Sequence, residues 1–190
     1  DGAMRVGYNW KLGPFEMMDK IGAASIVTRL EAAGKPVPEF IALAAQKGGF
    51  YTTEEAEIHR LTPSSTRVQV ARGSDTLTVA DLKRRGKPLQ RNASASIWDA
   101  GDGVLLIEYH SKMNAMDPLS LEIVLAAVDM AEYDDWKGIL IANDAKNFCA
   151  GANLGLALFA ANLAAWTEVE EFIALGQEAY QALKYAEVPV

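Results

Sequence analysis

A short apolar run followed by a loop of small residues decides the fold of this chain. It reads Gly138-Ile139-Leu140-Ile141-Ala142-Asn143-Asp144, then Asn147-Phe148-Cys149-Ala150-Gly151-Ala152-Asn153-Leu154. The continuous apolar run predicts a strand buried on both faces over residues 138–142. The small residues predict a loop whose backbone a ligand can approach closely, with Gly151 free to adopt a positive φ. Because a helical stretch follows, backbone N–H groups of the loop remain available to an anionic group.

The residues before this loop predict a strand hairpin and a helix. Residues 95–99 and 104–109 are expected to pair around the turn 100–103. Asp117-Pro118 should begin the helix, with Asp as its N-cap and Pro at its first position. The apolar stripe of this helix consists of Ile123, Val124, Ala127, Val128 and Ala131.

The order strand, helix, strand predicts a right-handed crossover and a mostly parallel sheet. A long helical segment, broken once or twice, is expected from about residue 156 to 186. Residues 188–190 read as the start of a further strand, so we expect the chain to be a piece of a longer protein.

The first 93 residues have a different character. Residues 1–60 read mainly as helices, with stops at Gly13-Pro14 and Gly22 and a helix expected over 38–46. Residues 66–71 and 75–79 alternate at period two around Arg72-Gly73-Ser74, which predicts a small hairpin. The charged stretch that follows, including the basic run 83–87, reads as a solvated linker.

Composition limits the classes of function. Half of the 190 residues are apolar, 23% are charged and the net charge is −7, which argues against nucleic acid or an anionic membrane as partner. One cysteine excludes an intramolecular disulfide framework and fits a reducing compartment, so we expect a cytoplasmic protein. No run approaches the length of a membrane helix, and no signal peptide opens the chain.

Taken alone, the small-residue loop favours a tight turn without a ligand. Together with Asn114-Ala115-Met116 upstream, however, it resembles the crotonase (enoyl-CoA hydratase/isomerase) family, in which a strand leads into an Ala-Gly loop and a helix. The resemblance covers residues 94–190 and implies the N-terminal half of a crotonase (ββα) fold. In that family the two segments together wrap the CoA part of an acyl-CoA thioester.

The resemblance implies roles for individual residues. Ala152 would supply one backbone N–H of an oxyanion hole. Ala150 and Gly151 would border the adenine and thioester path, and the backbone of Lys112 and Met113 the nucleotide end. Asn153 is also counted among the acyl-CoA-binding residues. Asn153 replaces the family's usual Asp, which puts a charge-dependent CoA contact in doubt. The second oxyanion donor and the two catalytic glutamates would lie beyond Val190.

Other chemistry-bearing residues have plainer interpretations. Glu168, Glu170 and Glu171 read as a solvated helix face rather than a catalytic pair. Cys149 reads as a small buried residue and His59 as a surface residue. His110 lies at the end of a strand, and contact with a ligand is the less favoured of its two interpretations.

The first region, with Gly13-Pro14-Phe15, Asp19 and Gly22, resembles the C-terminal helical domain of 3-hydroxyacyl-CoA dehydrogenases. Phe15 and Met18 are expected to pack its core. The fold expected is thus α/β: a helical dehydrogenase piece over 1–60, a hairpin and linker over 61–93, and half of a crotonase domain over 94–190. No G-x-G-x-x-G follows a strand, so NAD is expected only for a missing part of the parent, and no cofactor or metal is expected here.

A dehydrogenase piece followed by a linker and the start of a crotonase domain resembles the order in multifunctional fatty-acid β-oxidation proteins in which the dehydrogenase half comes first. The leading hypothesis is a parent enzyme that hydrates 2-enoyl-CoA and oxidises the 3-hydroxyacyl-CoA product with NAD, the chain alone being inactive. One alternative is another crotonase chemistry, isomerisation or thioester hydrolysis. A second is an acyl-CoA-binding or assembly module without turnover. The expected partner is an acyl-CoA thioester, and formation of a homo-oligomer is compatible with it. We expect neither a membrane span nor binding to nucleic acid.

Overall fold

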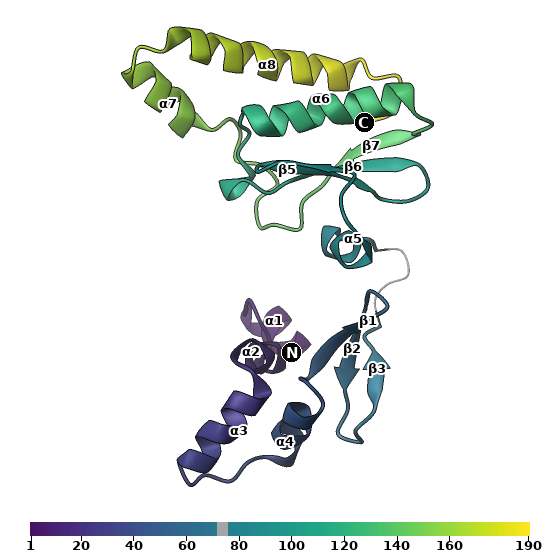
Figure 1. Ribbon diagram of the computed structural model, residues 1–190, viewed down its shortest axis with the longest axis vertical. Coiled ribbons are helices and arrows are strands. Elements are labelled where there is room, and N and C mark those ends of the chain that lie inside the picture. The colour runs from purple at the N-terminus through teal and green to yellow at the C-terminus, as the bar shows by residue number, and fades with distance from the viewer. Residues whose placement is uncertain (72–75) are drawn as a thin grey trace. The chain divides into compact units, whose positions relative to one another are not determined.

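The computed structural model describes residues 1–71 and 76–190, and the chain forms two compact units, Asp1–Thr76 and Leu77–Val190 (Figure 1). Each unit has its own sheet and its own buried core. The two units are described in turn.

The first unit combines four helices with a small sheet. The helices are α1 (Gly2–Tyr8), α2 (Pro14–Ile21), α3 (Ala23–Ala32) and α4 (Glu39–Gln46). The strands β1 (Tyr51–Glu54), β2 (Glu57–Leu61) and β3 (Arg67–Gln69) form an antiparallel sheet in the order β1-β2-β3.

Three phenylalanines form the centre of the first unit's core. The ring of Phe15 lies 5.6 Å from that of Phe40 and 4.7 Å from that of Phe50, centroid to centroid. Met18 packs against the same cluster. The expected core positions of Phe15 and Met18 are therefore confirmed, as are the helix start at Pro14 and the stop at Gly22, where φ is 93°. The helix expected over 38–46 forms as α4. It begins one residue later than expected, because Pro38 is its N-cap rather than a residue of its first turn.

Two parts of the first 93 residues differ from the sequence expectation. Residues 51–60 belong to the region expected to be mainly helical, but with Leu61 they form the β1–β2 hairpin. The hairpin expected over 66–79 is wrong in its second strand, because residues 76–78 belong to no strand and Val79 begins α5 (Val79–Arg85). β3 pairs with β2 instead. The expected turn 72–74 and Asp75 lie outside the described residues.

The second unit is built on a four-stranded sheet. Its strands, in the order β4-β5-β6-β7, are β4 (Gln90–Arg91), β5 (Ala95–Asp99), β6 (Val104–Tyr109) and β7 (Gly138–Ile141). Its helices are α5 (Val79–Arg85), the 3-10 turn η1 (Lys112–Asn114), α6 (Pro118–Tyr133), α7 (Leu154–Asn162) and α8 (Trp166–Lys184).

Helices cover the two faces of this sheet unequally. Ile97, Ile107 and Ile139 point to the face on which α6 and then α8 pack, whereas Trp98 and Leu106 point to the opposite face, against α5. Figure 1 shows α6 and α8 stacked on one side of the sheet and the short α5 on the other. The period-two alternation of β5 and β6 thus separates two apolar layers.

Several expected elements of the second unit are confirmed. The hairpin strands, 95–99 and 104–109, form as β5 and β6. Asp117 caps α6, its Oδ1 accepting the Ser120 N–H at 2.9 Å, and the predicted apolar stripe of this helix is buried. The long helical segment is broken once, between Asn162 and Trp166, with Ala164 at φ 54°.

Three expectations for the second unit need correction. The sheet is not mostly parallel, because only β6 and β7 pair in parallel while β4–β5 and β5–β6 are antiparallel. β7 is not buried on both faces, since Leu140 is 47% exposed where α5 does not reach. The basic run 83–87 is not all linker: Lys83 to Arg85 form the last turn of α5, where cations are favourable.

Residues 188–190 form no strand, although the Pro189 carbonyl accepts the Ile139 N–H at 2.9 Å beside β7.

Candidate functional site

Two asparagines hold the loop between β7 and α7. Asn143 accepts the Tyr109 N–H through Oδ1 at 2.8 Å and donates from Nδ2 to the Phe148 carbonyl at 2.7 Å. Asn114, only 6% exposed, donates to the Asn147 carbonyl at 2.8 Å and to the Phe148 carbonyl at 3.3 Å. The loop is therefore bound both to the end of β6, through Asn143, and to the η1 turn, through Asn114.

The end of this loop pairs with the segment that precedes α6. The Met116 N–H donates to the Gly151 carbonyl at 2.9 Å, and the Asn153 N–H donates to the Met116 carbonyl at 2.7 Å. Met116 and Ala152 thus form an isolated parallel bridge. Gly151 has the positive φ expected of it, 82°. The structure brings together the two motifs that the sequence singled out, although they lie 30 to 40 residues apart.

Ala152 sits at the centre of this pairing with its own N–H unused. Among the described residues, no acceptor lies within hydrogen-bonding distance of that N–H, whereas the residues before and after it are engaged with Met116. A backbone donor held on both sides and left without a partner is preorganised for an incoming oxygen.

An apolar cavity adjoins Ala152. We call this space of about 230 Å³ the near cavity. Its wall comes from the loop, from α6 and from one face of α8, and consists of Met116, Leu121, Ala152, Phe172, Ile173, Gly176, Gln177 and Tyr180. Neither a carboxylate nor a histidine of the described residues belongs to that wall. The near cavity can hold an apolar group beside a hydrogen-bond donor, but its wall offers no group that moves a proton at neutral pH.

Two tyrosines near the loop remain neutral hydroxyls at ordinary pH. Burial raises the pKa of Tyr109 to about 12, with smaller contributions from the charges of Tyr180 and Cys149. Burial and the same cysteine also raise the pKa of Tyr180. The Tyr180 hydroxyl donates to Met116 Sδ at 2.8 Å, which fixes one side of the near cavity.

The remaining residues of the predicted site lie around this centre. Lys112 and Met113 are exposed and lead into Asn114, with Met113 at φ 60°. Ala150 is exposed on the loop. Asn153 caps α7, its Oδ1 accepting the Leu156 N–H at 3.4 Å, so the amide keeps a capping role without the charge of an Asp. These positions are compatible with a bound thioester, and the contacts predicted for Lys112, Met113 and Ala150 stay predictions.

The structure also places the other residues considered from the sequence. Glu168, Glu170 and Glu171 are exposed, as expected of a solvated face. Cys149 is half-buried rather than buried, and its Sγ accepts the Gly151 N–H at 3.3 Å. Within the described chain, His59 Nδ1 and His110 Nε2 are enclosed without a hydrogen-bond partner, so His59 is not a plain surface residue.

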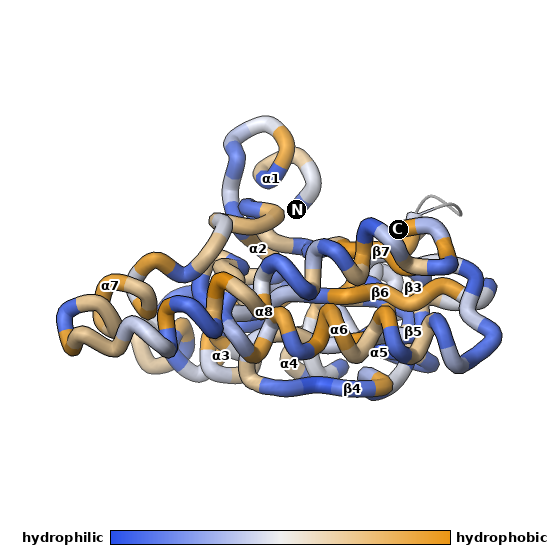
Figure 2. Tube along the Cα trace, turned by 90° about the horizontal axis from the view of Figure 1, so that it is seen from above, coloured by the Kyte–Doolittle hydropathy of each residue, from blue (hydrophilic) through white to orange (hydrophobic). Residues whose placement is uncertain are grey.

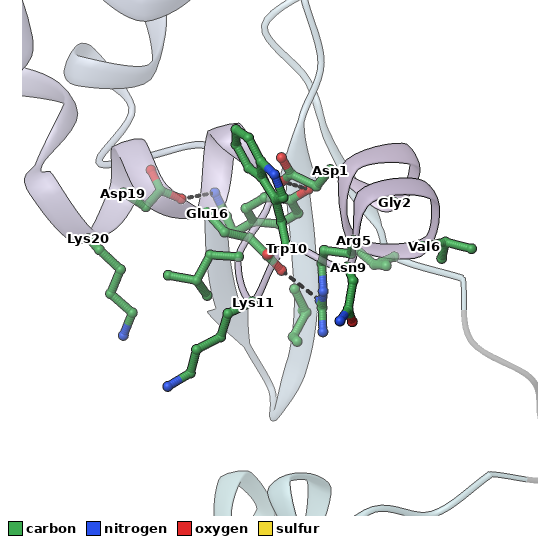
Figure 3. Close-up of a pocket in the computed structure, with 14 residues that line it drawn as sticks. Asp1, Gly2, Arg5, Val6, Asn9, Trp10, Lys11, Glu16, Asp19 and Lys20 are labelled. Atoms are coloured by element: carbon green, nitrogen blue, oxygen red, sulfur yellow. Dashed lines mark hydrogen bonds and ion pairs between the residues drawn. The ribbon is translucent and has the colours of Figure 1, made fainter. Parts of the chain in front are cut away.

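A cavity of about 1070 Å³ in the first unit lies beside α1 and α2 (Figure 3). Its carboxylates are already engaged in the fold. Asp1 accepts the Phe15 N–H at 2.8 Å and the Tyr51 hydroxyl at 2.7 Å, and Glu16 pairs with Arg5 at 3.0 Å. Asp1 thus links α2 to β1, and the Glu16–Arg5 pair links α2 to α1, so we assign these groups no ligand.

The sheet of the first unit does not have the arrangement of an NAD site. The first unit's sheet is antiparallel throughout, whereas a dinucleotide site needs a parallel strand leading through a Gly-rich turn into a helix. In residues 1–71 and 76–190, no group of three or more His, Cys, Asp or Glu side chains is placed to hold a metal ion. No helix of the described residues is both long and apolar enough to cross a bilayer.

Two features of this site were not predicted from the sequence: the hydrogen bonds by which Asn114 holds the loop, and the face of α8 that lines the near cavity. Asn114 was seen as part of a motif, but its hydrogen bonds to the loop carbonyls were not foreseen. The α8 wall, from Phe172 through Gly176 to Tyr180, follows helical spacing of three and four residues. That spacing could have indicated which face of α8 looks toward the loop.

Comparison with known proteins places the whole chain beside enzymes of fatty acid oxidation. It is 34% identical over 192 residues to a Bacillus subtilis protein named as a probable 3-hydroxyacyl-CoA dehydrogenase. It is 25% identical over 193 residues to proteins of Rickettsia felis and Rickettsia prowazekii, provisionally named fatty acid oxidation complex trifunctional enzymes. All of this chain is covered in each case, but it spans only 24% of each relative's length. No protein-family model matches the chain.

Proposed function

We propose that this chain carries the first half of an acyl-CoA thioester site and belongs to a longer enzyme of fatty-acid oxidation. The observation that carries this proposal is the unpartnered N–H of Ala152 at the wall of the near cavity. The names of the relatives, which match over the whole chain, support the metabolic setting.

The geometry suits a thioester whose carbonyl becomes an enolate. Negative charge then develops on the oxygen, and a donor fixed in place beforehand stabilises it without reorganisation. Ala152 is fixed by the hydrogen bonds of Gly151 and Asn153 to Met116. The apolar wall beside it would hold the acyl chain and exclude water, which strengthens the hydrogen bond.

In the longer protein, the finer proposal is hydration of a 2-enoyl-CoA followed by oxidation of the 3-hydroxyacyl-CoA product with NAD. Since the near-cavity wall has no acid or base, the proton-transferring groups and the second oxyanion donor would come from residues outside this chain. The NAD site would also lie outside it. The first unit's sequence resemblance and the name of the Bacillus subtilis relative support the dehydrogenase part.

Two alternatives make different use of the same site. Isomerisation or thioester hydrolysis would need the same oxyanion donor with other proton-transferring groups. A binding or assembly module would need none, and the absence of an acid or base from the near-cavity wall favours that behaviour for the chain by itself.

Assays of crotonyl-CoA hydration separate these possibilities. We expect the 190-residue chain to bind acyl-CoA without hydrating it, and the full-length protein to hydrate it. Hydration by the chain alone would refute the statement that its acid–base groups lie elsewhere. A full-length protein without hydratase activity would refute the hydratase assignment, and isomerase or thioesterase assays would then decide between the other chemistries.

The role of Ala152 is testable in the full-length protein. Ala152→Pro removes the N–H and should lower kcat about a hundredfold or more, the usual effect of losing one oxyanion donor. Ala152→Gly keeps the N–H and serves as the matched variant, so it should lose far less. If both variants lose rate equally, loop distortion explains the effect and the oxyanion role of Ala152 is wrong.

A further inference from the structure

Met116 joins the Ala152 loop to α8 through both its backbone and its side chain. Its N–H donates to the Gly151 carbonyl and its C=O accepts the Asn153 N–H, so it holds the chain on either side of Ala152. Its Sδ accepts the Tyr180 hydroxyl at 2.8 Å, and Met116 also lines the near cavity. A chemical change at this sulfur therefore acts on the loop and on the cavity wall together.

The surroundings of this sulfur are apolar on one side and open to solvent on another. Figure 2 shows orange and blue alternating along α8, as expected of a helix with one apolar face. Phe172, Ile173 and Gly176 of α8 line the near cavity. Met116 is only half-buried, and its hydrogen bond with Tyr180 is exposed. A small solute can thus reach the sulfur.

The Tyr180 hydroxyl covers one side of the sulfur. A thioether sulfur is a weak acceptor, and the hydroxyl occupies one of its lone pairs. Burial, with a smaller contribution from Cys149, raises the pKa of Tyr180, so the phenol stays protonated and continues to donate at ordinary pH. A reagent that attacks the sulfur therefore meets the other lone pair.

We propose that Met116 is a site of oxidation by hydrogen peroxide, that the oxygen is added at the lone pair left free by Tyr180, and that the sulfoxide closes the thioester site. This inference rests on the proposed function, because the site that is closed is the one at Ala152. The free lone pair attacks one peroxide oxygen and the O–O bond breaks. The proton on the transferred oxygen passes to the departing hydroxide, which leaves as water. Sulfur loses the two electrons that the peroxide gains, and methionine sulfoxide is formed.

The added oxygen interferes with a thioester in either of two positions. The Tyr180 hydroxyl is on the other side of the sulfur, and the donors that remain in the cavity wall are the Ala152 N–H and the exposed amide of Gln177. An oxygen that accepts the Ala152 N–H takes the donor intended for the thioester carbonyl. An oxygen that does not accept it lies as a polar atom where the acyl group binds. We expect crotonyl-CoA affinity to fall at least about tenfold, the effect of one unpaired polar atom in an apolar site.

Calorimetric titration of the 190-residue chain with crotonyl-CoA, before and after treatment with hydrogen peroxide, measures this loss. Every protein carries Cys149→Ser, because the half-buried thiol of the same loop is oxidised as well. Peptide mass spectrometry identifies the methionines that have gained oxygen. Each protein is compared with itself, so an effect of a substitution on the untreated affinity does not enter the result.

Two leucine variants locate the effect. Met116→Leu keeps a similar apolar volume without a sulfur, so its affinity should change less than about twofold on treatment. Met113→Leu is the matched control, because Met113 is 59% exposed and lies three residues away. It should lose affinity as the parent protein does. Unchanged affinity after oxidation of Met116, or an equal loss in Met116→Leu, would overturn the proposal.

The configuration of the sulfoxide is a second measurement that does not depend on ligand binding. With one lone pair occupied by Tyr180, one epimer should be in excess at Met116, whereas Tyr180→Phe should give both. Each of the two methionine sulfoxide reductases acts on one epimer, so treating the digested peptides with each enzyme counts them. Exposed Met113 should give both epimers in either protein. Equal amounts of both at Met116 in the parent would refute the role of Tyr180.

Reduction of the oxidised chain separates the switch from general damage. The reductase for the predominant epimer should restore crotonyl-CoA affinity. A loss of affinity that persists after Met116 has been reduced would mean that another lesion caused it, and the switch would be wrong while the proposed function stands. If the untreated chain does not bind crotonyl-CoA at all, the thioester site itself is refuted, and the switch with it.

Discussion

Asn114 illustrates how a single side chain can hold a binding loop. It adopts the left-handed conformation, with φ 54°, and its Nδ2 donates to two loop carbonyls. Asn114→Gly keeps the backbone conformation but loses the donor, and we expect a cost of about 1–2 kcal/mol in the free energy of unfolding. Asn114→Ala should cost about 1 kcal/mol more, because Ala disfavours a positive φ.

Urea unfolding of the two Asn114 variants measures both contributions. If both variants lose the same free energy of unfolding, the left-handed backbone at residue 114 does not add to the cost of Asn114→Ala. Stabilities unchanged in both would mean that the loop does not depend on Asn114. Acyl-CoA affinity should fall in parallel, since the loop carries Ala152.

Tyr109 makes stability depend on alkaline pH. Burial raises its pKa to about 12 from the ordinary 10, so the folded state favours the neutral phenol. Its contribution to stability is complete below pH 10, because the phenol is then protonated in both states. As pH rises from 10 toward 12, only the unfolded state loses the proton, and stability falls.

Urea unfolding midpoints between pH 8 and 11.5 should therefore decline above pH 10, and Tyr109→Phe should lessen that decline. Tyr133→Phe is the control, because Tyr133 is 82% exposed. A decline that is the same in both variants would exclude Tyr109 as its cause.

At the residue scale, the sequence predicts those features that depend on residues close by along the chain. The positive φ of Gly151 and the capping by Asp117 follow from neighbours a few residues away. The hydrogen bonds of Asn114 to residues 147 and 148 could not be predicted, because they form only once η1 and the loop meet in space.

Gly176 weakens α8, and the fold leaves room for a side chain at this position. Glycine in a helix interior costs about 0.5–1 kcal/mol relative to alanine, and a Cβ here would make only an ordinary contact with Leu121 at 3.8 Å. Gly176→Ala should therefore stabilise the protein by about that amount in urea unfolding.

Gly155→Ala is the contrasting variant. Gly155 also lies in a helix, but its Cβ would approach the capping Oδ1 of Asn153 at 3.2 Å. The gain in helix propensity should be offset by disturbance of the cap. A larger gain at Gly155 than at Gly176 would contradict this account.

At the scale of whole elements, the sequence identified those with a clear period and missed those with an unusual turn. The β1–β2 turn places Glu55 and Ala56 at φ 50° and 67°. Both values belong to a turn that normally takes Asn-Gly, so no turn signal marked the hairpin. The exposure of Leu140 could not be foreseen either, because it depends on how far the seven-residue α5 extends over the sheet.

At the scale of the whole molecule, the two units differ in the size of their cores. The buried apolar residues of the first unit are Ala23, Ala44, Phe50 and Leu61. The second unit has a larger buried core between its sheet, α6 and α8. Since burial of apolar surface is the dominant favourable term in folding, the first unit should be the less stable of the two.

Truncating one core at a time tests whether the units unfold separately. Phe50→Ala should destabilise the first unit by about 3–5 kcal/mol, and Ile107→Ala the second by about 2–5 kcal/mol. Phe50 is 2% exposed and Ile107 is fully buried, so both changes create cavities. Hydrogen exchange followed by mass spectrometry reports on each unit through its own peptides.

In Phe50→Ala, exchange should accelerate in peptides from α2 to β2 and stay slow in β6 and α6. Ile107→Ala should give the reverse pattern, because each substitution removes contacts only from its own core. Acyl-CoA binding would then survive Phe50→Ala, since the Ala152 loop and the near cavity belong to the second unit. Accelerated exchange across both units in either variant would mean that the chain unfolds as one cooperative body, with binding dependent on both cores.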